Sequence, residues 1–442
     1  MPLDLPLDVP GSDLILDPEA RIRRSLLPGG VRLLTETDRS VRSASIGFWL
    51  PVGSRDETPQ HAGSTHVLEH LLFKGTARRS AMDIAAAFDE VGGESNAVTA
   101  KEHTFYYGRV RSTDVPIAVD VLTDMLTSSR LADEALETER EVILEELAMA
   151  ADDPSDIGYE TFLEQVIGPG TALGRPVGGT AETVGALHGE DVRAHYRTHY
   201  RPDSLVVTAV GDLDHDELAR MVLERLAEGG WELPDGALPA PGRAPAPGRR
   251  ETGTSAVAEL VPHRLGRDTE QVHVYLGGPG LPATDPQRHV MNVLMSILGG
   301  GMSSRLFQHI REERGLAYSV YSFSGGYREA GLFGMYAACR PARTEEVVAL
   351  LREELAELGR SGPAPEEMRR ALGQITGSLA LGLEDTSSRM GRLGSTELIH
   401  GRYASVDETI GRIAAVSAQD VQELARTLAG SFTTRVDIGP AV

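Results

Sequence analysis

The sequence has a single cysteine and no long apolar run. With only Cys339 in 442 residues, the chain has no means of forming an intrachain disulfide or a cysteine-rich zinc site. No segment approaches the roughly 20 consecutive apolar residues that span a bilayer, and Met1 to Glu19 is acidic and punctuated by proline rather than basic and then apolar. We therefore expect a cytoplasmic protein without membrane segments, in which histidine and carboxylate side chains hold any metal ion.

Basic residues are also scarce. The chain has 43 Lys and Arg against 65 Asp and Glu, which gives a formal net charge of −22. Such a field repels phosphate backbones and attracts cationic partners, although an acidic surface also simply keeps a protein soluble. Nucleic acid is therefore not an expected partner. Among the basic residues only Lys74 and Lys101 are lysine, a bias that resembles whole-genome composition more than a site feature.

One change of composition divides the chain. Residues 232–254 lose the apolar periodicity and become rich in proline, alanine and glycine, as in a semi-extended linker. The sequence thus predicts an N-terminal extension at 1–29, a first domain at 30–231, the linker at 232–254 and a second domain at 255–442.

The two halves show internal similarity. When His66 is placed opposite Asn292, the strand-like segment Ile46–Leu50 falls on Val272–Leu276, and later strand-like and helical runs also correspond. Chance similarity between two α/β segments is the alternative. The economical interpretation is an α+β fold of two homologous domains, each a mixed, mostly antiparallel sheet backed by helices.

The segment STHVLEHLLFKG predicts a short helix of two to three turns. Ser64 or Thr65 is the expected N-cap, and Gly75 is the expected residue just after the helix. Within such a helix His66 and His70 are four residues apart and lie on the same face. Two imidazoles at this spacing are able to share one metal ion.

Glu69 lies at the edge of the same helix face. Its carboxylate is placed to take a proton from a water molecule on the metal without acting as a ligand. The pattern His-x-x-Glu-His is that of inverted zinc peptidase motifs. The alternative is a pair of hydrogen-bonded histidines on an ordinary amphipathic helix.

A catalytic zinc site needs a third protein ligand. The predicted helix Leu136–Ala150 carries Glu139 and Glu146 two turns apart, both on its apolar stripe. Because a carboxylate directed at a core must be paired or bound to metal, we expect Glu146 to be the third ligand and Glu139 to orient a histidine. The alternative is that both are surface acids compensated by Arg140.

The segments HVLEHLLFKGT (66–76) and EREVILEE (139–146) resemble the pitrilysin/insulinase family, in particular its bacterial members similar to the mitochondrial processing peptidase β-subunit. The resemblance covers nearly the whole chain, from Gly30 to Gly439. Other segments that carry it are residues 96–99, 102–104, 173–180, 201–205, 299–307 and 310–319.

The resemblance implies a clamshell of two α+β domains, often paired with a second chain to enclose a peptide-holding chamber. It implies that His66, His70 and Glu146 bind one Zn²⁺ per chain and that Glu69 is the general base. Because one chain holds the whole set, a homodimer is expected, while a heterodimer with a related chain stays open.

Four further residues receive roles from the resemblance. Asn96 and Ala97 match the edge-strand segment that binds an extended peptide backbone. Arg311 and Tyr318 match a pair from the second domain that closes over the scissile bond, where Tyr318 supports the oxyanion. In the second half of the chain, the counterparts of His66, Glu69 and His70 are unable to form the same site, because they are Asn292, Met295 and Ser296.

The sequence therefore predicts a zinc metalloendopeptidase that cleaves extended, cationic or presequence-like peptides in an enclosed chamber. The alternative is a non-catalytic or partner-dependent assembly or docking subunit on the same fold. Specific processing and general peptide degradation are not separated by any sequence pattern.

Overall fold

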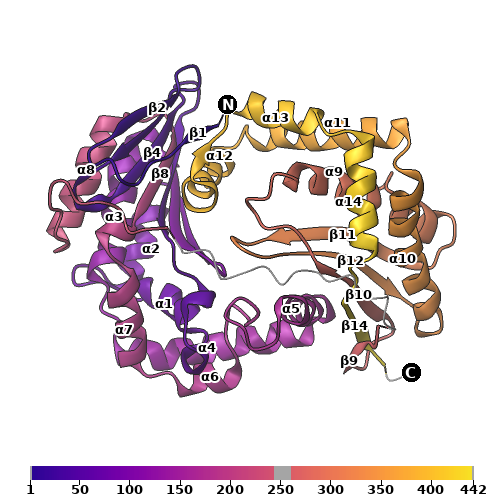
Figure 1. Cartoon of the computed structure of the whole chain (residues 1–442). Coiled ribbons are helices and arrows are strands. Elements are labelled where there is room, and N and C mark those ends of the chain that lie inside the picture. Colours follow the sequence, from indigo (N-terminus) through magenta and orange to yellow (C-terminus); the bar gives the residue numbers. More distant parts are fainter. Residues whose placement is uncertain (1, 243–259, 441–442) are drawn as a thin grey trace. The chain divides into compact units, whose positions relative to one another are not determined.

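The computed structural model describes residues 2–242 and 260–440 (Figure 1). Contacts divide these residues into two compact units. The first contains residues 2–147, 175–242 and 381–405, and the second contains residues 148–174, 260–380 and 406–440. Each unit is built around one β-sheet.

The sheet of the first unit has, within the described residues, seven strands in the order β2-β3-β4-β8-β5-β7-β6. Strands β4 and β8 are parallel, and every other neighbouring pair is antiparallel. The central strands β5 and β8 are buried on both faces, which fits their nearly continuous apolar sequences. The strands are β2 (Asp13–Asp17), β3 (Ile22–Leu26), β4 (Arg32–Thr37), β5 (Ser43–Leu50), β6 (Glu94–Thr99), β7 (Thr104–Arg111) and β8 (Val206–Gly211).

One face of this sheet packs against helices from the first half of the chain. Side chains such as Ile46, Phe48, Leu68, Leu122 and Val222 form one buried apolar cluster. The helices that contribute to it are α1 (Ser64–Leu72), α2 (Ala81–Asp89), α3 (Val115–Ser128), α4 (Asp133–Asp152), α6 (Ala181–Ala186), α7 (Gly189–His199) and α8 (His215–Glu228).

The other face of the first sheet is covered by a helix from the second half of the chain. Helix α12 (Thr386–Ser395) packs on β5 and β8, where Met390 and Leu393 join a second apolar cluster with Trp49 (Figure 1). The approach is close, because a Cβ atom at Gly394 would lie 2.5 Å from the Trp49 ring. A short pairing of β1 (Leu3–Asp4) with β13 (Arg402–Tyr403) follows on the same unit.

The sheet of the second unit repeats this design. Its five strands within the described residues have the order β11-β12-β10-β14-β9, with β14 and β9 parallel. This matches the order β6-β7-β5-β8-β4 of the first sheet, in which β8 and β4 are the parallel pair. The strands are β9 (His263–Gly266), β10 (Val272–Pro279), β11 (Ala317–Gly326), β12 (Gly331–Cys339) and β14 (Thr434–Gly439). The predicted α+β fold with two similar sheets is confirmed.

The second sheet is also covered on both faces. One face carries a large apolar cluster with helices that include α9 (Arg288–Gly299), α10 (Thr344–Ser361), α11 (Pro365–Gly382), α13 (Val406–Ala414) and α14 (Ala418–Ala429). The other face is covered by α5 (Pro154–Ile167), a helix from the first half of the chain, through Phe162 and Leu163. A Cβ atom at Gly158 of α5 would lie 2.5 Å from the Tyr275 ring.

The compact units therefore differ from the predicted division into 30–231 and 255–442. Residues 148–174 belong with the second unit and residues 381–405 with the first, because each sheet has a second apolar face that a helix from the other half buries. The predicted extension 1–29 contributes β2 and β3 to the first sheet. Of the predicted linker, residues 243–254 lie outside the described residues.

Helix α12 and the turn that follows it are fixed to the first sheet by a buried ion pair. Arg24 Nε and Nη2 donate to the two carboxylate oxygens of Glu397, each at 2.8 Å, and Arg32 Nη1 lies 3.7 Å from the same carboxylate. The side chains of Arg24 and Glu397 are 0% and 1% exposed. One carboxylate thus neutralises charge from two strands.

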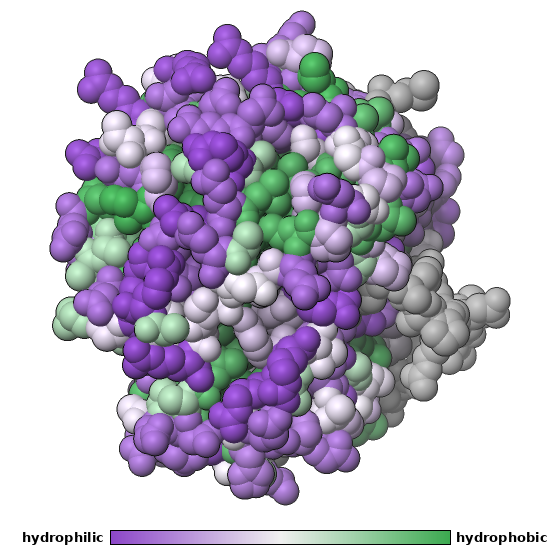
Figure 2. Space-filling view, turned by 90° about the vertical axis from the view of Figure 1, so that its left-hand side faces the viewer, coloured by the Kyte–Doolittle hydropathy of each residue, from purple (hydrophilic) through white to green (hydrophobic). Residues whose placement is uncertain are grey.

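The surface matches the composition. The face over α3, α7 and α8 is mainly hydrophilic, with small scattered hydrophobic patches (Figure 2). Among the helices that the structure describes, none combines the length and the apolar content that crossing a bilayer requires.

We predict that Glu397→Gln lowers the free energy of unfolding by about 3–5 kcal/mol, because it leaves two buried guanidinium groups without a carboxylate. The midpoint of urea denaturation measures this. Asp4→Asn is the matched control, since it breaks the exposed Asp4–Arg402 pair and is expected to leave the midpoint unchanged. Equal midpoints for Glu397→Gln and Asp4→Asn would contradict the prediction.

Candidate metal centre

Helix α1 is anchored by one face and presents its chemical groups on another. Val67, Leu68 and Leu71 of α1 are buried in the core of the first unit. His66 and His70 are only partly buried, and their ring centroids are 4.7 Å apart in an edge-to-face arrangement. The predicted helix and the predicted pairing of the two histidines on one face are thus observed.

The start of α1 differs from the expectation. The N-cap is Gly63 rather than Ser64 or Thr65, and no cap side chain accepts a hydrogen bond at this position. Instead the two carboxylate oxygens of the buried Glu57 accept from the backbone N–H groups of Gly63 and Thr65, at 2.8 and 2.7 Å. The backbone N–H groups at a helix start usually donate to the side chain of the N-cap residue. Here they donate to a carboxylate from outside the helix. Helix α1 ends at Leu72 with Phe73 as its C-cap, so Gly75 is not the residue just after the helix; it lies further on, with a positive φ of 119°.

Helix α4 brings the two predicted carboxylates to the histidines. Glu146 Oε2 lies 3.9 Å from His66 Nε2 and 3.6 Å from His70 Nε2. Glu139 is 4% exposed, as expected for a carboxylate on the apolar stripe. Glu146, in contrast, has a side chain that is 47% exposed, so the argument that it points into a core is wrong. It lies beside the histidines because it is two turns from Glu139, which itself contacts His70.

The three groups fit a metal ion. One ligand atom from each of His66, His70 and Glu146 lies within 4.8 Å of the other two, and this is the one such group found among residues 2–242 and 260–440. Two imidazoles and a carboxylate are a donor set that Zn²⁺ prefers, and three protein ligands leave a coordination position open. Burial lowers the pKa of His66 and the adjacent His70 lowers it further, which favours the neutral imidazole that a metal needs.

Glu139 contacts one of the histidines. Its Oε2 lies 3.1 Å from His70 Nδ1, which leaves Nε2 of His70 facing Glu146. Its Oε1 lies 2.7 Å from Lys74 Nζ. The alternative in which Arg140 compensates Glu139 is not observed, since Arg140 pairs with Glu137. His66 Nδ1 is buried and has no hydrogen-bond partner among the described residues.

Glu69 is held by the edge strand of the sheet. Thr99 Oγ1, at the end of β6, donates to Glu69 Oε2. Among the described strands, β6 pairs with β7 alone and is therefore an edge of the first sheet. Asn96 and Ala97 lie on this edge, where the Ala97 N–H donates to the Asn96 side chain at 2.8 Å. Strand β6 thus has two features. Its last residue holds the carboxylate of Glu69, and its open edge is able to pair with another strand.

Arg311 and Tyr318 belong to the second unit. Arg311 lies on a π-helical turn, Phe307–Glu312, and its guanidinium carbon is 4.6 Å from the Phe307 ring centre and 4.5 Å from that of Tyr318. Tyr318 is the second residue of β11, an edge of the sheet as the structure describes it, and is 76% exposed. The roles that the resemblance implies for the pair stay a prediction.

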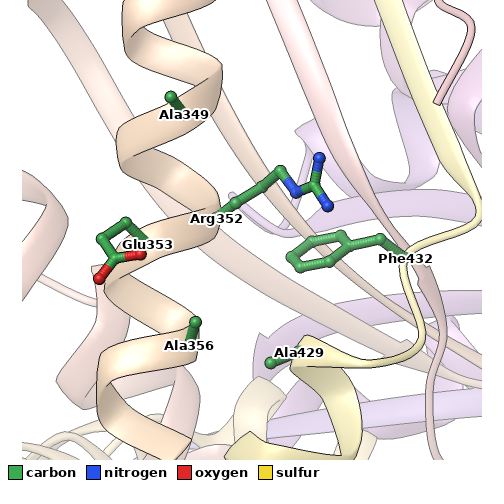
Figure 3. Close-up of a pocket in the computed structure, with 6 residues that line it drawn as sticks. All are labelled: Ala349, Arg352, Glu353, Ala356, Ala429 and Phe432. Carbon is green, nitrogen blue, oxygen red and sulfur yellow. The ribbon is translucent and has the colours of Figure 1, made fainter. Parts of the chain in front are cut away.

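A shallow pocket of about 350 Å³ lies elsewhere on the second unit, between α10 and the end of α14 (Figure 3). The guanidinium of Arg352 extends toward the Phe432 ring, 5.8 Å from its centre. Glu353 is the one other ionisable residue of the lining. The lining offers no pair of acid and base, and it does not compete with the metal centre as a site of chemistry.

Comparison with known proteins places this geometry in a family. The profile described as Insulinase (Peptidase family M16) matches residues 32–181, and the profile described as Peptidase M16 inactive domain matches residues 186–375. An uncharacterized zinc protease of Streptomyces coelicolor is 50% identical over 419 residues, which cover 95% of this chain and 90% of that protein. The chain belongs to the insulinase family of peptidases.

A second relative and two solved structures are also similar to this chain. An uncharacterized zinc protease of Bacillus subtilis is 37% identical, with 92% of this chain and 95% of that protein covered. A crystal structure of a peptidase M16 inactive domain from Pseudomonas fluorescens superposes with a TM-score of 0.84 at 18% identity, covering 95% and 98% of the two chains. A protease from Helicobacter pylori has a TM-score of 0.82 at 20% identity, with 95% and 100% covered. These two structures show the shared fold.

Sequence reasoning missed three residues around the metal centre. Thr99 orients Glu69, Glu57 holds the start of α1, and Lys74 contacts Glu139. Thr99 and Lys74 stand inside segments that carry the family resemblance, which was the available signal. Glu57 carries no local signal, because its partners belong to a turn and a helix that follow it.

We predict that Glu57→Gln destabilises the protein more at pH 5 than at pH 8. The amide leaves one N–H of the α1 start without an acceptor, at a cost of about 1–3 kcal/mol. Burial raises the pKa of Glu57 to about 7, so the folded wild type binds more protons than the unfolded chain between pH 4.5 and 7 and loses stability as pH rises through this window. The amide of the variant does not titrate, so the variant does not lose this stability as pH rises. Urea denaturation at both pH values tests this, and an equal difference at both would contradict it.

Proposed function

We propose that this member of the insulinase family is a zinc endopeptidase with one Zn²⁺ per chain, held by His66, His70 and Glu146, and with Glu69 as general base. The observation that carries the proposal is the convergence of the three ligand atoms within 4.8 Å. It is supported by Glu69, which lies on the same short helix and is held by Thr99.

Each residue of the centre has a separate role in the proposed reaction. When bound, Zn²⁺ would make a water molecule more acidic and would polarise the scissile carbonyl. Glu69 takes a proton from the attacking water and returns it to the leaving amine. Thr99 fixes Oε2 of Glu69 by its hydrogen bond, so that the other carboxylate oxygen is left to exchange the proton. Glu139 keeps His70 in the tautomer whose Nε2 is the ligand atom.

The proposed substrate is an extended, cationic peptide. A peptide strand added beside Asn96 and Ala97 would complete the open edge of β6, with modest demands on its sequence. The same strand ends at Thr99, the partner of Glu69, so that a peptide on this edge lies next to the base. The net charge of −22 favours basic peptides over acidic ones. An enclosed chamber and a dimer are part of the same proposal and rest on the family resemblance.

We predict that Glu69→Gln keeps the metal and loses turnover. The substitution leaves all three ligands in place and removes only the group that accepts the proton. We expect about one zinc per chain in both proteins, and at least a 100-fold lower rate of cleavage of a quenched, arginine-containing peptide. Metal analysis and the cleavage rate measure the two effects. Glu141→Gln on the solvated face of α4 is the control and should be as active as wild type.

Two results would reject the proposal. Zinc-free wild type, purified without chelators, would favour the alternative of a non-catalytic assembly subunit. Equal turnover in wild type and Glu69→Gln would exclude Glu69 as the base.

A third result bears on the alternative. Turnover by the purified chain alone would exclude dependence of the activity on a separate subunit.

We predict that Tyr318→Phe lowers kcat by about 10–100-fold with no change in zinc content, because the resemblance gives the Tyr318 hydroxyl a role at the oxyanion. Steady-state kinetics with the same quenched peptide measures this. Tyr321→Phe removes a hydroxyl from the same strand, β11, and serves as the control. A kcat for Tyr318→Phe equal to that of the control would remove Tyr318 from the reaction.

A further inference from the structure

The two lysines of this chain are exceptions in an arginine-rich protein. Of 43 basic residues, only Lys74 and Lys101 are lysine. Lys74 follows α1 by two residues and reaches the metal centre, where its Nζ lies 2.7 Å from Oε1 of Glu139. Lys74 is therefore the one of the two lysines that contacts a carboxylate beside the histidines.

Each oxygen of Glu139 has its own partner. Oε2 lies 3.1 Å from His70 Nδ1 and Oε1 lies 2.7 Å from Lys74 Nζ. The Glu139 side chain is 5% exposed, while that of Lys74 is 37% exposed. The partly exposed ammonium group of Lys74 therefore holds a buried carboxylate that also contacts His70.

We propose that Lys74 is a positioning residue of the metal centre. It fixes Oε1 of Glu139, which keeps Oε2 on Nδ1 of His70 and keeps Nε2 of His70 directed at Glu146. The proposal rests on the proposed function, since it assigns Lys74 to the zinc site. Partners beyond the ligands typically change metal affinity by about 10–100-fold.

The geometry explains why arginine does not serve here. A guanidinium is a planar fork that is able to bind both oxygens of a carboxylate at once, whereas an ammonium acts as a point charge. Arg24 binds both oxygens of Glu397 in this way. At Glu139 such a fork would compete for Oε2, the oxygen that orients His70. Lysine engages one oxygen and leaves the other to the histidine.

The test measures zinc affinity of the full chain, by competition with a chromophoric chelator, in wild type, Lys74→Met, Glu139→Gln and the double variant. Arg78→Met is the matched control. It also removes a cation from a buried carboxylate, because Arg78 Nε lies 3.0 Å from Oδ1 of Asp124, whose side chain is 1% exposed. Asp124 has no described contact with the three ligands.

We expect Lys74→Met to raise the zinc Kd about tenfold and Arg78→Met to leave it within twofold. In the Glu139→Gln background, Lys74→Met should add less than twofold, because Lys74 acts through Glu139. An unchanged Kd for Lys74→Met, an equal loss for Arg78→Met, or effects of Lys74→Met and Glu139→Gln that multiply would each overturn the proposal.

Lys74→Arg keeps the charge and covers the case in which Lys74→Met does not fold. We expect this variant to bind zinc several-fold more weakly than wild type, because the guanidinium would compete for Oε2 of Glu139. Affinity equal to that of wild type would overturn this argument. The readout also separates the two proposals. Failure of wild type to bind zinc rejects the proposed function together with this inference, whereas tight binding by wild type and by every variant rejects only the role of Lys74.

Discussion

Both sheets of this protein have two apolar faces, and the need to bury the second face shapes the whole chain. Helix α12 covers the first sheet through Met390 and Leu393, and α5 covers the second through Phe162 and Leu163. Each helix comes from the half of the sequence that builds the other sheet. Glu146 lies near the end of the first-unit part of α4, just before the chain passes to α5.

Three buried carboxylates of the first unit share one feature. Glu57 accepts from two backbone N–H groups, Glu139 contacts His70 and Lys74, and Glu397 contacts two arginines. In each case both oxygens are engaged, as the high cost of an unpaired buried charge requires. Glu146 differs from these three, since it is half-exposed with Oε2 beside two imidazole nitrogens. A carboxylate in that state is suited to bind an ion.

Much of the centre could be predicted from spacing, because its ligands lie on two helices whose periodicity is local. The four-residue step from His66 to His70 and the seven-residue step from Glu139 to Glu146 specify which side chains share a face. The contacts of Thr99 and Glu57 could not be predicted, since they join segments whose pairing depends on the tertiary fold. The exchange of α5 and α12 was missed for the same reason: amphipathicity shows that a helix needs an apolar partner and does not say which sheet supplies it.

The matching strand orders and the exchanged helices together have the form of a domain-swapped dimer contained in one polypeptide. A dimer of two separate, identical chains must keep the same residues in both copies. Joined in one chain, the copies are free to diverge, and α9 carries Asn292 and Ser296 where α1 carries His66 and His70. The two copies thus differ in the residues at these positions, while each sheet still needs a helix from the other half of the sequence to bury its second apolar face.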